Sequence, residues 1–191
     1  MLEIPDITHL AKLAKNLKII HTNSYLQSYP YFINFFKEKR TITESDIILW
    51  SFFTYGWMPT ILKKINADNN QESVLDILNR VKTWYIPDVW ELSKIKHYIN
   101  NSIVWGSKLL HFINPHIFPI WDSKIAAYFW IYGNKINVVD TYKEYIEIMI
   151  SLSNHVLCDE IQKDLSEKIG YSITKIRSLE LVIFSQQRNE P

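Results

Sequence analysis

The chain has 191 residues, of which 47% are hydrophobic and 21% charged, a length and composition that support one well-formed core and exclude a disordered tail. Its 21 basic and 20 acidic side chains nearly cancel, so net charge alone favours no class of partner. A single cysteine, Cys158, excludes an internal disulfide and any four-cysteine zinc or iron–sulfur site.

The first six residues contain two acids and no basic region, which is unlike a secretory signal. The longest nearly apolar stretch covers residues 47–58 and is shorter than the roughly 18–20 residues that a membrane-spanning helix needs. We therefore expect a cytoplasmic protein with no membrane partner.

Apolar residues recur at helical spacing along the chain and predict an all-α fold in one domain, residues 1–191. Asp6 is placed to cap a first helix that carries Ile7, Leu10 and Ala14 on one face. A second helix is expected to begin at Thr43 or Ser45. The remaining helices are expected over residues 74–81, 88–99, 105–112, 123–132, 141–152, 159–169 and 173–186. The pattern predicts a compact multi-helix body and leaves open whether its helices form two lobes around a cleft.

Charge is distributed unevenly along the chain. The window from Leu92 to Val139 contains five lysines, and Asp122 is its only acid. A locally positive region on an otherwise acidic body is typical of a phosphate-binding surface, although scattered lysines also form ordinary solvated faces.

Within this window, Gly106 predicts a turn or a close backbone approach just before a helix. Lys108 is then expected in the first turn of an apolar helix, where the helix dipole and partial burial both lower the pKa of its amine. A neutral amine is the form that acts as a nucleophile.

Pro115 and Pro119 predict an extended connector after this helix, because the residue before a proline avoids the α region. Asp122 follows the connector and is placed to cap the next helix. An aspartate there is most often only a cap, and a first-turn lysine is most often solvated. It is the combination of this lysine and this aspartate that indicates a catalytic site.

Residues 105–124, with Gly106-Ser107-Lys108, an apolar helix, a proline-containing link and Pro119-Ile120-Trp121-Asp122, resemble the catalytic segment of the helix-hairpin-helix DNA glycosylases. The similarity is to the compact 8-oxoguanine DNA glycosylase branch, and residues 176–184 resemble a closing helix of that branch. The resemblance implies a helix-hairpin-helix glycosylase-like fold, with Lys108 as the nucleophile that attacks the sugar and Asp122 as the assisting carboxylate.

The activity implied is excision of a damaged or modified base, 8-oxoguanine by default, through a lysine Schiff base that also permits AP-lyase nicking of the strand. The implied partner is double-stranded DNA with one base flipped out of the stack, and no cofactor or metal is expected. Expected contacts to the flipped base are Trp121, His111 and Trp57, and expected contacts to DNA are Gly106, Ser107, Lys94, Lys96 and Lys124.

Two other interpretations stay open. The chain could be a non-catalytic helical module that binds nucleic acid, with steep salt dependence and no base release. It could also be an all-α protein-interaction domain whose basic window is a partner surface.

Overall fold

A computed structural model describes residues 1–57 and 71–186, and these residues contain helices and no strand. Their ten α-helices and one 3-10 helix are α1 (Ile7–Asn16), α2 (Ser24–Lys37), α3 (Glu44–Trp57), α4 (Gln71–Lys82), α5 (Val89–Tyr98), α6 (Ile103–Ile113), α7 (Ser123–Tyr128), η1 (Gly133–Asn137), α8 (Val139–Ser153), α9 (Val156–Ile169) and α10 (Lys175–Ser185). Among these described helices, none reaches the length and apolarity that a bilayer crossing requires. The all-α prediction is confirmed.

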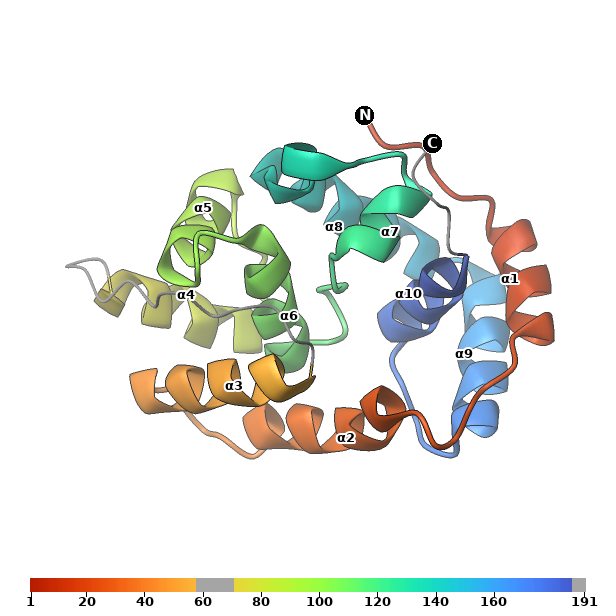
Figure 1. Cartoon of the computed structure of the whole chain (residues 1–191), viewed down its shortest axis with the longest axis horizontal. Helices are drawn as coiled ribbons and strands as arrows, with labels where there is room; N and C mark the ends of the chain where they lie inside the picture. The colour runs from red at the N-terminus through yellow and green to blue at the C-terminus, as the bar shows by residue number, and fades with distance from the viewer. Residues whose placement is uncertain (58–70, 187–191) are drawn as a thin grey trace.

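The helices form two groups, and α2 runs along the lower edge of the view beneath both of them (Figure 1). Helices α3 to α6 form one group, and α1 with α7 to α10 forms the other. Helix α6 packs against α2, α4 and α5 and also contacts α8, so it joins the two groups. Their buried apolar side chains belong to a single hydrophobic cluster.

Helix α2 was not expected from the sequence, because Pro30 lies in its interior and cannot donate the usual backbone hydrogen bond. That missing bond would have gone to the carbonyl of Leu26, four residues earlier. The Tyr171 hydroxyl donates to this carbonyl instead, at 2.8 Å. A contact from a residue distant in sequence therefore replaces what the proline removes.

Helix α6 begins two residues earlier than expected, because the Ser102 side chain caps it by accepting from the Trp105 amide. Gly106 is consequently inside the helix and not in a turn before it. It allows a close approach to α5, since a Cβ atom at this position would lie 3.3 Å from Cγ2 of Ile95. Lys108 lies in the second helical turn. The expectation of a first-turn lysine acted on by the helix dipole was therefore wrong.

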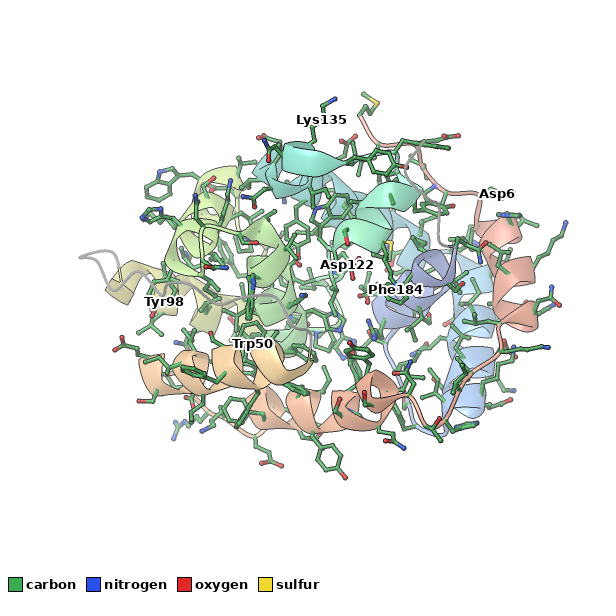
Figure 2. All side chains as sticks on the ribbon, viewed as in Figure 1. Asp6, Trp50, Tyr98, Asp122, Lys135 and Phe184 are labelled. Atoms are coloured by element: carbon green, nitrogen blue, oxygen red, sulfur yellow. The ribbon has the colours of Figure 1, made fainter. Side chains whose placement is uncertain are left out.

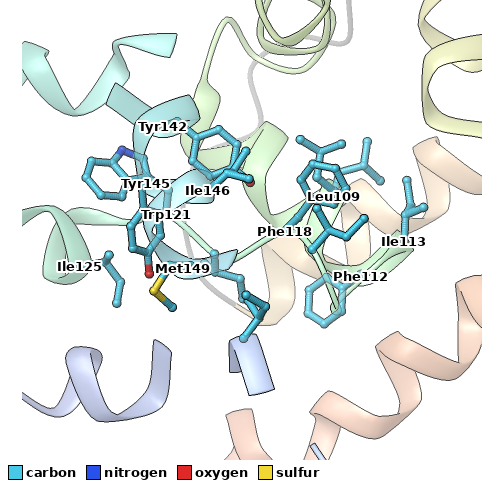
Figure 3. Close-up of a cluster of buried hydrophobic side chains, with 14 of the residues drawn as sticks. Leu109, Phe112, Ile113, Phe118, Trp121, Ile125, Tyr142, Tyr145, Ile146 and Met149 are labelled. Atoms are coloured by element: carbon cyan, nitrogen blue, oxygen red, sulfur yellow. The ribbon is translucent and has the colours of Figure 1, made fainter. Parts of the chain in front are cut away.

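The connector after α6 and helix α8 both contribute side chains to the core. Figure 3 shows Trp121 beside the α8 side chains Tyr145 and Met149, and Phe118 and Leu109 on the other side of the same cluster. Ring centroids of Trp121 and Tyr145 are 5.1 Å apart. The connector is thus a core element, although it has no regular secondary structure.

Candidate active site

Lys108 is buried in the interior of the protein, with 2% of its surface exposed. Its amine lies 5.7 Å from the centroid of the Trp105 ring and makes no hydrogen bond or ion pair with a residue that the structure describes. Burial lowers the pKa of Lys108, and the nearby Asp122 carboxylate opposes that effect. An uncompensated buried amine is costly to charge, so its neutral form is favoured.

Several polar atoms on the helices around Lys108 are also buried without partners. The indole nitrogens of Trp50 and Trp105 and the hydroxyl of Thr54 have no hydrogen-bond partner among the residues that the structure describes. The two indole rings meet edge to face at 6.3 Å between their centroids. Most buried polar groups in native proteins are hydrogen-bonded. The three unpaired groups at the α3–α6 contact are therefore candidate contacts for a ligand.

Asp122 is half-buried at the start of α7, near the centre of the molecule in Figure 2. Its Oδ1 atom accepts from the amides of Lys124 at 3.0 Å and Ile125 at 2.9 Å, so the predicted helix cap is present. The other carboxylate oxygen, Oδ2, accepts no hydrogen bond from a described residue. The charge of Asp122 therefore remains partly available beyond its capping role.

Ser107 ties α6 to the residue before Asp122. Its hydroxyl accepts from the Trp121 amide at 3.0 Å and lies 3.1 Å from the Trp121 carbonyl. Because Ser107 immediately precedes Lys108, this contact fixes the backbone of the proposed nucleophile against that of the proposed carboxylate.

The first part of the connector is held by α6 and α8. The Phe118 carbonyl lies 2.7 Å from Nδ1 of His111, and the Pro119 carbonyl accepts from the Tyr142 hydroxyl at 3.1 Å. A carbonyl only accepts, so the imidazole proton is on Nδ1, and Nε2 accepts from the Tyr29 hydroxyl at 2.8 Å. Burial lowers the pKa of His111 to about 3, which keeps the ring neutral.

Glu180 of α10 holds the middle of the connector. Its Oε2 atom accepts from the Ile120 amide at 2.8 Å, and its other oxygen pairs with Arg177 in the interior. Burial raises the pKa of Glu180 to about 7, against the opposing effects of Arg177 and the Ile120 amide. The four residues from Phe118 to Trp121 are thus each bonded to a side chain from α6, α8 or α10.

Sequence reasoning did not identify Glu180, Arg177 or Tyr142 as parts of this arrangement. The available signal was the pair Arg177 and Glu180, two charges on a helix whose other core positions are apolar apart from Ser178. Charges three residues apart on a helix share a face, and here that face is buried.

The residues expected to contact a flipped base occupy different environments. Trp121 is fully buried, and its indole N–H donates to the Ile136 carbonyl at 2.8 Å, so its ring belongs to the core and offers no exposed stacking surface. His111 is also fully buried. Trp57 ends α3, and its side chain lies outside the described residues.

The expected DNA contacts divide into buried and exposed positions. Gly106 and Ser107 are buried inside α6, so neither is on the surface of the free protein. Lys96 donates to the Asn137 carbonyl at 2.8 Å, and the Lys94 amine lies 3.5 Å from the centroid of the Trp90 ring. Lys124 is exposed, with its amine 4.6 Å from the centroid of the Phe184 ring.

Within residues 1–57 and 71–186, no three His, Cys, Asp or Glu side chains are grouped closely enough to hold a metal ion. The arrangement that the structure does show is a buried amine within the electrostatic influence of a carboxylate. Compared with protein-family models, with curated proteins and with solved structures, the chain matches none.

Proposed function

We propose that the protein is a DNA glycosylase that removes a damaged or modified base through Lys108, with 8-oxoguanine as the first base to test. The observation that carries this proposal is the buried Lys108 amine, which has a lowered pKa and lies within the electrostatic influence of Asp122. A lysine of this kind is a nucleophile without the need for a separate strong base.

The proposed reaction begins when the Lys108 nitrogen forms a bond to C1′ of the sugar and the bond from C1′ to the base breaks. The base leaves with the bonding electrons and takes up a proton, and Asp122 stabilises the positive charge that develops on the sugar. Loss of the amine proton and opening of the sugar ring give a Schiff base. Removal of a C2′ proton then expels the 3′ phosphate, which nicks the strand.

Substrate has to reach an amine that is covered in the free protein. We infer that the helices around Lys108 separate when a flipped base enters, and that the orphaned donors of Trp50, Thr54 and Trp105 then face the base or sugar. Exposed Lys124 and half-buried Lys94 supply positive charge for the DNA backbone.

The test is reductive trapping. The protein is incubated with duplex oligonucleotides that each carry one modified base, in the presence of borohydride, and covalent adducts are resolved by gel. We expect an adduct with at least one modified duplex and none with the unmodified duplex. Lys108→Gln abolishes it, because no other amine occupies that position.

The matched control is Lys82→Gln. Lys82 is half-buried, and burial lowers its pKa as it does that of Lys108. This variant is expected to keep the adduct. An adduct that persists in Lys108→Gln assigns the nucleophile to another residue. Binding to DNA with no adduct on any duplex favours the non-catalytic nucleic-acid-binding module.

A further inference from the structure

A second site is suggested by a pocket of about 520 Å³ on the far end of α6. It is formed by α2, by the C-terminal ends of α4 and α6, and by the loop between α9 and α10, all of which can be followed in Figure 1. Neither Lys108 nor Asp122 lines it. Its volume is within the range of roughly 300–1,000 Å³ that small-molecule sites have.

Trp84 at the rim of this pocket has an unusual backbone. Its φ angle is 71°, in the left-handed region that Gly or Asn adopts more readily after a helix. Its side chain is 64% exposed, so burial of the ring does not offset the strain of this backbone conformation. The ring instead lies 5.4 Å from the His116 ring, centroid to centroid, at the pocket. Strain held at an exposed aromatic residue beside a pocket indicates a role in binding.

The lining of the pocket is positively charged. It contains Lys37 and Lys82 and no carboxylate. The C-terminal ends of α2 and α4 also meet here, and one carbonyl of each accepts from a side chain: the Lys82 amine donates to the Phe36 carbonyl at 2.6 Å, and the Asn114 side-chain amide donates to the Val81 carbonyl at 3.1 Å. Lysine has three donors, so two N–H groups of Lys82 remain for a ligand.

We propose that this pocket binds a nucleoside monophosphate. The base lies against the rings of Trp84 and His116, and the phosphate lies toward Lys37 and Lys82. Aromatic stacking accepts any base, since every base has a flat π face, and a doubly charged phosphate is favoured where two lysines meet no acid. This inference does not depend on the glycosylase proposal.

Isothermal titration calorimetry with adenosine 5′-monophosphate tests the site, with adenosine and inorganic phosphate as separate titrants. We expect the monophosphate to bind with a dissociation constant of about 1 mM or lower and the two fragments to bind at least about tenfold more weakly. Trp84→Asn keeps a residue that tolerates the left-handed backbone and removes the ring, and it should weaken binding about tenfold. Lys37→Gln should weaken it several-fold.

Lys12→Gln, an exposed lysine on α1 away from the pocket, is the matched control and should leave binding unchanged. Absence of binding at about 5 mM monophosphate overturns the proposal. So does binding that Trp84→Asn and Lys37→Gln leave unaltered, or phosphate binding as tight as that of the nucleotide. A 5′-phosphorylated trinucleotide that competes for the pocket would identify a strand end as the source of the same nucleotide chemistry. Borohydride trapping at Lys108 is a separate readout, so either proposal can fail alone.

Discussion

The Asp122 carboxylate accepts two backbone amides at the start of α7 with one oxygen and influences the pKa of Lys108 by its charge. Capping and charge can be separated because asparagine is as good a helix cap as aspartate and is neutral. A change that keeps the cap isolates the chemical contribution of the charge.

We predict that Asp122→Asn alters the free energy of unfolding by less than about 0.5 kcal/mol and lowers the rate of adduct formation about 100-fold or more. Urea unfolding and borohydride trapping measure the two effects. Asp6→Asn, the same change at the cap of α1, should alter neither. Wild-type trapping by Asp122→Asn would leave Asp122 with a capping role alone.

At the scale of elements, the connector between α6 and α7 is ordered by side chains and not by secondary structure. Ser107 is the closest of these to the proposed chemistry, since it bonds the Trp121 backbone and adjoins Lys108. Its removal leaves the buried backbone amide of Trp121 without its acceptor, and a buried amide is costly to leave unpaired.

Ser107→Ala should therefore destabilise the protein by about 1–3 kcal/mol in urea unfolding. The control is Ser153→Ala, because the Ser153 hydroxyl bonds only the Ile150 carbonyl of its own helix, and we expect a cost of about 0.5 kcal/mol or less. At temperatures where both variants are fully folded, only Ser107→Ala should slow trapping. Equal trapping rates would show that the connector needs no support from α6.

At the scale of the whole molecule, two buried groups make stability respond to pH in opposite directions. The folded pKa of His111 is about 3, below its ordinary 6.5, so the unfolded chain binds the extra proton between these values and acid destabilises the fold. The folded pKa of Glu180 is about 7, above its ordinary 4.5, so here the folded chain binds the proton and stability rises as pH falls. Arg177 and Tyr29, which face this pair, keep their protonation states in this range.

Between pH 6.5 and 4.5 the two effects largely cancel in the wild-type protein, since each amounts to about 1.4 kcal/mol per pH unit at most. In His111→Gln the Glu180 effect is no longer opposed by His111, so we expect the stability of this variant to rise relative to that of the wild type as pH falls from 7 to 4.5. Urea unfolding at several pH values measures this. His21→Gln, an exposed histidine, should parallel the wild type. A parallel profile for His111→Gln would contradict the prediction.

Each expected helix has a counterpart, because apolar spacing and capping residues such as Asp6, Asp88 and Asp122 are local signals. The helix expected over residues 123–132 was too long, since α7 ends at Tyr128 and Trp130 has a left-handed backbone. Helix α2 could not be predicted in the same way, since the group that compensates for Pro30 is Tyr171, 145 residues away from Leu26. The start of α6 was misplaced because Gly106 suggested a turn, whereas its small size serves the contact with Ile95.

The sequence singles out Lys108 and Asp122 as candidates, but it does not predict what surrounds them. Lys108 and Asp122 are marked by local sequence, but the burial of Lys108 depends on how α3 and α6 pack. The same holds for Glu180, whose partner Ile120 lies 60 residues earlier in the chain. Such contacts leave no trace in periodicity or spacing.

The hydrogen bonds of the connector also determine how the protein unfolds. Residues Phe118 to Trp121 are bonded to side chains of α6, α8 and α10, so none of these helices can detach without breaking buried hydrogen bonds of the others. The three helices therefore form one cooperative unit, and α10, although late in the sequence, cannot fray independently. Loss of α10 would release the segment that carries Asp122, so the integrity of the proposed active site depends on a helix that contributes no reacting group to it.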